Sequence, residues 1–284
     1  MSNANVTTFG IEIECTLPTE FVYANNIRIG GYHRGIQIPG LPEGWTAQND
    51  GSIRAGRGRW GVEVVSPVLC GAEGIRQVQF VVAWLKAAGA SVNASTGLHV
   101  HVGFAGDVDA LQRLVTMTAN HEKGIYASTG TKSRENGSYC RPVRSNADMQ
   151  QQFRDTDNCC QSSRYHVLNT TNYRRNATVE FRAFAGTLNI HKILGYVQLS
   201  IGLVNKALAA KRLIKWDSKP TSETSPIKKG GIGQTELNRL LFALGWNKGR
   251  VSTVWGQIDL PEGAPGINEC KRKLLEMAAK YDLS

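Results

Sequence analysis

The chain has 284 residues, 41% of them hydrophobic and 20% charged, and a formal net charge of +10. This composition excludes a disordered chain, and the length fits one large domain but not two full-sized catalytic domains. The longest apolar run, over residues 80–85, is far shorter than the about 20 residues of a membrane helix. The positive charge favours anionic partners such as nucleotides, nucleic acid or acidic peptides.

The cysteines and the N-terminus indicate a reduced, cytoplasmic protein. The six cysteines include no Cys-x-x-Cys pair, and their spacing matches neither a zinc ribbon nor a secreted disulfide framework. The polar start of the chain lacks the basic and apolar regions of a secretory signal.

The first part of the chain alternates between apolar periods of 2 and 3.6 residues, which predicts strands and helices in turn. In chain order we expect a strand over 8–15, an irregular segment over 18–48, a strand over 61–66, a helix over 72–88 and a strand over 97–104.

The pattern continues through the second part. A helix is predicted over 107–126 with Asp107 as its N-cap, then a long Arg-rich loop over 129–164, strands over 165–169 and 178–184, and a helix over 190–211. Strands separated by helices or long loops indicate an α+β domain that packs one sheet face on helices and leaves the other for function.

The C-terminal part differs in composition. Residues 218–234 are typical of a linker, and helices are predicted over 235–245 and 268–281. We therefore predict a catalytic domain over 1–217, a linker over 218–234 and a helical appendage over 235–284.

Four predicted strands carry chemically reactive side chains on one face. Alternate residues of a strand share a face, and in each of these strands the opposite face is apolar. The polar faces hold no Lys, unlike an ordinary wet sheet face, and consist of Glu12, Glu14, Glu63, His99, His101, Glu180 and Arg182.

If these strands are neighbours, four carboxylates converge. Two like charges about 4 Å apart repel by roughly 4 kcal/mol at an effective dielectric of about 20, so the cluster must protonate or bind cations. Oxygen ligands select Mg²⁺ or Mn²⁺, and a histidine can join them. Because Mg²⁺ usually arrives with phosphate, Arg182 would then stabilise a phosphoryl group in transfer.

The segment 50–61 is rich in Gly and Arg. It contains a formal Gly-x-Gly-x-x-Gly pattern, but this precedes a strand and does not open a helix, so a dinucleotide site is excluded. This loop and the 129–164 segment are candidate lids over an anionic substrate.

Five segments, taken in order over about residues 8–205, resemble the putative amidoligase family of the carboxylate-amine ligase superfamily, which includes glutamine synthetase and glutamate-cysteine ligase. The segments are Phe9-Gly10-Ile11-Glu12-Ile13-Glu14, Asp50-Gly51-Ser52, Gly61-Val62-Glu63-Val64-Val65-Ser66-Pro67, Gly97-Leu98-His99-Val100-His101-Val102 and Val179-Glu180-Phe181-Arg182.

The resemblance implies a fold and an activity. The fold would be a curved, mainly antiparallel sheet with helices on its convex face and the active site on its concave face, as in glutamine synthetase. The activity would be ATP- and Mg²⁺-dependent formation of an amide, peptide or isopeptide bond between a carboxylate and an amine. The reaction would pass through an acyl phosphate and release ADP and phosphate.

The resemblance also implies roles for single residues. Glu12, His99 and Glu180 would hold the ion that bridges the ATP phosphates, and Glu14 and Glu63 the ion nearer the acceptor carboxylate. Arg182 and Glu63 would be the catalytic residues, with Arg182 steadying the transferred phosphoryl group. Nucleotide contacts would come from His101, Arg182, Arg164, Asn169 and Ser52. Glutamine synthetase has two carboxylates where this chain offers only Glu63.

Two other functions remain open from the residues. One is a phosphotransferase that acts on a guanidino or amine group with a related fold. The other is a basic nucleic-acid-binding protein or a metal-dependent nuclease. For the ligase, the expected partners are small-molecule or peptide carboxylates and amines, with an acidic protein or peptide as a candidate acceptor and no nucleic acid or membrane.

Overall fold

The structure is a computed structural model that describes residues 7–143, 163–212, 228–246 and 260–284. The described residues form an α+β fold around one seven-stranded sheet with the order β2-β3-β4-β1-β5-β7-β6. Every pair of neighbouring strands is antiparallel. The expected α+β class and mainly antiparallel sheet are therefore confirmed.

Four strands are long enough to carry an alternating pattern, and three are short. The strands are β1 (Phe9–Pro18), β2 (Ile36–Gln37), β3 (Thr46–Gln48), β4 (Arg59–Val65), β5 (Gly97–Gly103), β6 (Leu168–Asn169) and β7 (Thr178–Ala185). The helices are α1 (Thr19–Ala24), α2 (Gly71–Ala87), α3 (Val108–Ala127), α5 (Tyr173–Asn176), α6 (Ile190–Ala209), α7 (Ile232–Ala243) and α8 (Ile267–Leu283).

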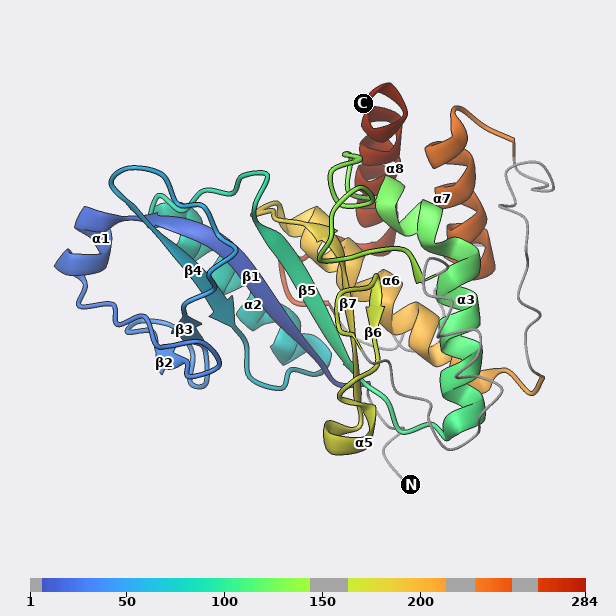
Figure 1. Cartoon of the computed structure of the whole chain (residues 1–284), viewed down its shortest axis with the longest axis horizontal. Helices are drawn as coiled ribbons and strands as arrows, with labels where there is room; N and C mark the ends of the chain where they lie inside the picture. The colour runs from blue at the N-terminus through green and yellow to red at the C-terminus, as the bar shows by residue number, and fades with distance from the viewer. Residues whose placement is uncertain (1–6, 144–162, 213–227, 247–259) are drawn as a thin grey trace.

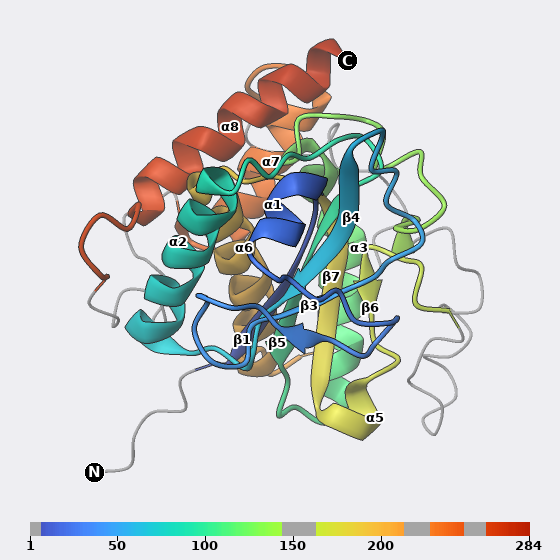
Figure 2. The same cartoon turned by 90° about the vertical axis from the view of Figure 1, so that its left-hand side faces the viewer.

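The apolar face of the sheet is buried against helices. In β1 the residues Phe9, Ile11, Ile13 and Cys15 are at most 3% exposed. Figure 1 shows α2 and α6 behind the sheet, and Figure 2 shows the same helices on one side of β1 and β5. The alternation in sequence therefore assigns the apolar side chains to the core and leaves the acidic side chains on the other face.

The pairing register brings the polar positions of separate strands opposite one another. Glu12 of β1 pairs with His99 of β5, and Glu14 pairs with Glu63 of β4. His101 of β5 pairs with Glu180 of β7. The β5–β7 register shifts between Leu98 and Val100, so this bulge lies beside the polar cluster.

The predicted helix over 107–126 is α3, and its start has the expected chemical cause. The Asp107 side chain accepts a hydrogen bond from the backbone N–H of Ala110 at 2.8 Å, which satisfies one of the free donors of the first turn.

The segment 18–48 is more ordered than its sequence indicates, because it contains α1, β2 and β3. Elements of two to six residues are too short to show a period. The short strand β3 pairs with β4 and aligns Gln48 with Glu63, so it contributes to the polar face.

The two C-terminal helices pack on the rest of the fold. Leu237 and Leu240 of α7, and Leu274 and Tyr281 of α8, belong to the same core cluster as the sheet. Residues 232–234, expected in the linker, begin α7. The expected domain boundary at 217 lies outside the described residues and stays a prediction. No helix in the described part of the chain has the length and apolar character needed to cross a membrane.

Candidate functional site

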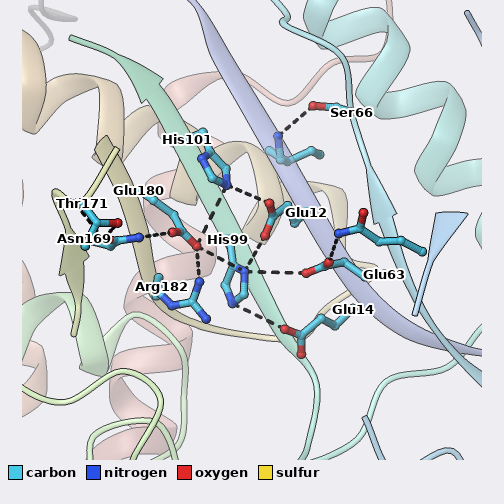
Figure 3. Close-up of polar contacts among 12 residues, drawn as sticks. Glu12, Glu14, Glu63, Ser66, His99, His101, Asn169, Thr171, Glu180 and Arg182 are labelled. Carbon is cyan, nitrogen blue, oxygen red and sulfur yellow. Dashed lines mark hydrogen bonds and ion pairs between the residues drawn. The ribbon is translucent and has the colours of Figure 1, made fainter. Parts of the chain in front are cut away.

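The polar faces of β4, β1, β5 and β7 meet in one cluster of carboxylates and imidazoles (Figure 3). Glu12 lies between the two histidines of β5. Its Oε2 is 2.8 Å from His99 Nδ1, and its Oε1 is 3.0 Å from His101 Nε2. Both histidines therefore contact the same carboxylate. This agrees with the sequence, in which His99 and His101 are alternate residues of one strand and so share a face.

His99 is the centre of the cluster and is only 3% exposed. Its Nδ1 is 3.5 Å from Glu180 Oε1 and 3.9 Å from Glu63 Oε1, while its Nε2 is 3.5 Å from Glu14 Oε1. All four predicted carboxylates thus surround a single imidazole ring. The sequence expectation that separate strands pool these side chains agrees with this geometry.

Three groups of side chains place ligand atoms within 4.8 Å of one another. These groups are Glu12–His101–Glu180, Glu12–Glu63–His99 and Glu14–Asp50–Glu63. Carboxylate oxygens with an occasional imidazole are the donors that suit Mg²⁺ or Mn²⁺, so the residues fit a site for hard divalent cations.

Asp50 is a member of this cluster that the sequence interpretation did not assign. It lies next to Glu14 and Glu63, where only one carboxylate, Glu63, was expected. The signal was present, because Asp50 opens one of the five segments that carry the family resemblance. Asp50 lies on a loop, where residues do not alternate between two faces as they do in a strand. The direction of its side chain therefore could not be predicted from the sequence.

The carboxylates of the cluster are held in different protonation states. Burial alone would raise the pKa of Glu12, but hydrogen bonds from His101 and His99 keep it well below its usual value. Burial also acts against ionisation of Glu180, yet the positive charges of His101 and Arg182 lower its pKa. These two side chains are therefore ionised at neutral pH.

Glu63 behaves in the opposite way. Burial, followed by the negative charge of Glu12, raises its pKa to about 8, although Gln48 donates a hydrogen bond to its Oε2 at 2.6 Å. Without a cation the cluster therefore retains a proton on Glu63 at neutral pH. A divalent ion would replace that proton.

We expect the free energy of unfolding of the EDTA-treated protein to fall as pH rises from 6.5 to 9. The Glu63 pKa of about 8 lies above its ordinary 4.5, so its contribution is present at low pH and lost as pH rises through 8. For His101, burial acts to lower the pKa, but Glu12 and Glu180 raise it from 6.5 to about 9, so its contribution is lost in the same direction. Urea unfolding at several pH values measures this slope, which Glu63→Gln should reduce. A free energy that rises over this range would contradict the assignment.

Arg182 and Asn169 complete the β7 side of the cluster. Arg182 forms a buried ion pair with Glu180 Oε1, and Asn169 Nδ2 donates to Glu180 Oε2 at 2.6 Å. The Nε of Arg182 is buried and has no hydrogen-bond partner. This guanidinium therefore keeps one donor free beside the carboxylates.

Three cavities follow the polar face. One of about 400 Å³ is bordered by Glu12, His101, Val68 and Asn172. A second of about 320 Å³ lies over His101, Glu180 and Arg182. A third of about 150 Å³ lies at the Glu14 end of the cluster.

The other residues expected at the site fall into different cavities. Asn169 lines the 320 Å³ cavity with His101. Ser52 lines the 150 Å³ cavity with Glu14 and not the cavities at His101. Arg164 borders both the 150 Å³ and 320 Å³ cavities. Most of the 129–164 segment, expected as a lid, lies outside the described residues.

Comparisons with known proteins give one family and several remote structural similarities. The family model described as "Putative amidoligase enzyme" matches residues 5–204. A comparison with curated proteins finds no match.

Similar solved structures include a bifunctional glutathione synthetase from Pasteurella multocida, with 9% identity over 97% of this chain and a TM-score of 0.45. They also include the complex between the prokaryotic ubiquitin-like protein Pup and its ligase PafA, with 12% identity over 96% of this chain and a TM-score of 0.42. The chain spans 48% and 62% of the lengths of these two structures.

Proposed function

The chain belongs to the putative amidoligase family, and we propose that it is a cytoplasmic, ATP- and Mg²⁺-dependent carboxylate-amine ligase. It joins a carboxylate and an amine in an amide, peptide or isopeptide bond and releases ADP and phosphate. The observation that carries this proposal is the convergence of Glu12, Glu14, Glu63 and Glu180 on His99, with Arg182 beside them.

The proposed catalytic fold is that of glutamine synthetase. In this proposal the sheet is curved, its convex face packs on helices such as α2 and α6, and its concave face carries the site. The separation of the buried apolar face of β1 from its acidic face supports this arrangement.

The two proposed cation positions use different residues. Glu12, His99 and Glu180 would hold one ion near the ATP phosphates. Glu14 and Glu63 would hold the ion nearer the acceptor, with Asp50 in reach of it. Bound Mg²⁺ or Mn²⁺ neutralises the phosphate oxygens and so favours nucleophilic attack on phosphorus. The lowered pKa values of Glu12 and Glu180 suit ligands that must be ionised.

The nucleotide is proposed to lie at the His101 end of the face. The 400 Å³ cavity is lined by Pro67 and Val68, which are apolar, and by Asn172 and Asn176, which carry amide groups. These features suit a purine base, while the phosphates extend toward His101 and Arg182 in the adjoining cavity. Asn169 and Arg164 also line this adjoining cavity.

The proposed reaction has two steps. An oxygen of the substrate carboxylate attacks the γ-phosphorus, the bond from phosphorus to the β,γ-bridging oxygen breaks, and ADP leaves. The amine nitrogen then attacks the acyl carbon, the carbon–oxygen bond to phosphate breaks, and the proton lost by the nitrogen goes to the departing phosphate. Arg182 balances charge on the transferred phosphoryl group, and Glu63 lies on the acceptor side. Because acyl phosphates hydrolyse, the 50–61 and 129–164 segments are the proposed lids.

Hydroxylamine should trap the acyl phosphate as a hydroxamate. The purified chain is incubated with ATP, Mg²⁺, hydroxylamine and a panel of carboxylic acids that includes acidic peptides, and hydroxamate and ADP are measured together. Equal amounts of both are expected with an accepted acid. ADP with a phosphorylated guanidino or amine compound would identify a phosphotransferase instead, and phosphodiester cleavage without ATP would identify a nuclease.

ATP with Mg²⁺ should raise the melting temperature of the protein. A ligand at about 100 times its dissociation constant stabilises the native state by about 2.7 kcal/mol, which is roughly 5–10 °C for a chain of this size. ATP without a divalent ion should give a smaller shift, because the phosphates would then lie next to ionised Glu12 and Glu180. Absence of any shift at saturating nucleotide would contradict the nucleotide site.

A further inference from the structure

The loop over residues 30–35 brings two aromatic side chains to the polar face that the proposed function does not use. Tyr32 lines both the 150 Å³ and the 320 Å³ cavity, and His33 lines the 320 Å³ cavity. Their two rings contact each other, with centroids 3.8 Å apart. Tyr32 therefore lies where the proposed nucleotide side and the proposed acceptor side of the face adjoin.

Backbone hydrogen bonds hold this loop on the sheet. The N–H of Gly30 donates to the Ala47 oxygen at 3.0 Å, and the Gly30 oxygen accepts from the N–H of Asn49 at 2.9 Å. Within the loop, the N–H of Arg34 donates to the Gly31 oxygen at 2.9 Å and closes a turn. These contacts fix the loop to β3 and so fix the position of the two rings relative to the cavities.

The backbone of the loop is tightly packed and has an uncommon conformation. A Cβ on Gly30 would overlap the Arg34 backbone oxygen, and a Cβ on Gly35 would overlap the Thr46 hydroxyl. His33 has a φ of +57°, in the left-handed region that is uncommon for residues other than glycine. Such conformations cost about 1–3 kcal/mol and are concentrated at functional sites, which indicates a role for the His33 side chain.

His33 is a proton acceptor that the cation cluster leaves free. Apart from its ring contact with Tyr32, its imidazole forms no hydrogen bond or ion pair within the described residues. Every carboxylate and every other histidine that lines the 150 Å³ or the 320 Å³ cavity belongs to a candidate cation group. Once cations occupy those groups, His33 is the remaining side chain of the two cavities that suits a general base.

The second step of the proposed reaction requires such a base. Most amines are ammonium ions at neutral pH, and an ammonium nitrogen has no lone pair with which to attack an acyl carbon. Imidazole changes its protonation near neutral pH, which suits a group that takes up a proton and then releases it. The exposed ring of Tyr32 beside it presents a face that attracts an ammonium ion.

We propose that His33 is the general base of the amine step and that Tyr32 binds the incoming ammonium group. This rests on the proposed ligase function. The His33 imidazole takes one proton from the ammonium ion, which leaves the lone pair on the nitrogen, and the neutral amine attacks the acyl carbon. The second proton leaves with phosphate, and His33 releases its proton to solvent after turnover.

A comparison of hydroxylamine with ammonium compounds tests the base. Hydroxylamine is mainly uncharged at neutral pH and can attack without a base. An acid that the wild type converts to a hydroxamate is incubated with ATP, Mg²⁺ and, in separate reactions, hydroxylamine, ammonia, glycine or Nα-acetyl-lysine. His33→Asn should lower the rate of amide formation by about 100-fold or more and leave hydroxamate formation unchanged. Asparagine tolerates the left-handed backbone at this position but cannot take up a proton.

Three further variants make the result specific. His191→Asn is the matched control, because His191 of α6 lines none of the cavities of the polar face, and both rates should stay unchanged. Glycine also fits the backbone at residue 33, so added imidazole should restore part of the amide formation that His33→Gly loses. Tyr32→Ala should raise the KM of the ammonium compounds more than that of hydroxylamine.

The outcomes separate this proposal from the ligase function. If His33→Asn forms amides at the wild-type rate, or loses hydroxamate formation to the same extent as amide formation, His33 is not the base, although the hydroxamates of the wild type uphold the ligase. A wild type that forms hydroxamates but no amide from any of the three ammonium compounds would also overturn the proposal. If the wild type forms no hydroxamate with any acid, the ligase function itself fails and the role of His33 fails with it.

Discussion

Glu12→Gln is expected to lower kcat/KM for ATP turnover by at least about 100-fold while the protein stays folded. Glu12 is shared by two of the three groups of candidate ligands, and its carboxylate lies between His99 and His101. Glutamine preserves the shape and one acceptor oxygen but removes the charge that binds a cation. Release of ADP measures the activity, and circular dichroism with the melting temperature measures the fold.

Retention of the fold has a specific physical reason in this variant. The glutamine keeps one oxygen that accepts a hydrogen bond from an imidazole. Loss of the Glu12 charge also lowers the pKa of Glu63, so that Glu63 can ionise and partly replace the lost negative charge beside the histidines. Glu73→Gln is a suitable control, because Glu73 is an exposed carboxylate on α2 that pairs with Arg76. Full activity of Glu12→Gln would exclude Glu12 as a ligand of an essential cation.

The polar face could be predicted because a strand encodes its two faces locally. Alternation in 9–15 and 98–102 assigns Glu12 and His99 to the face opposite the core without knowledge of any other strand. Their direct pairing could not be derived in the same way. It depends on the strand order β4-β1-β5-β7, which joins segments up to about 170 residues apart and is set by tertiary packing.

The residues that the sequence analysis missed lie on loops or on a strand too short to show an alternation of polar and apolar residues. Gln48 comes from a three-residue strand, Asp50 from the following loop, and Arg134 from the loop after α3. Only general signals pointed to them: Asp50 opens a family segment, and Arg134 belongs to the Arg-rich stretch expected near the substrate. Loop side chains reach a site through contacts such as that of Arg134 with the Arg182 backbone, which sequence spacing does not encode.

Arg182→Met is expected to lower kcat by about 10³-fold or more, the effect of removing an arginine that stabilises phosphoryl transfer. The variant should also lose about 3–5 kcal/mol of stability, because Glu180 would remain buried and ionised without its partner. These two effects must be separated before the activity loss can be assigned to chemistry.

The double variant Glu180→Gln with Arg182→Met separates them. It replaces the buried ion pair with two neutral side chains, so it should recover most of the lost stability in urea unfolding. It should not recover kcat, and its kcat should fall below that of Glu180→Gln alone, since the donor that remains free in the wild type, Arg182 Nε, is still absent. Arg182→Lys keeps the charge but not the planar set of donors, and is expected to fall between the wild type and Arg182→Met in kcat. If the double variant were as active as Glu180→Gln alone, Arg182 would be a structural partner of Glu180 and not a group that acts on the phosphoryl group.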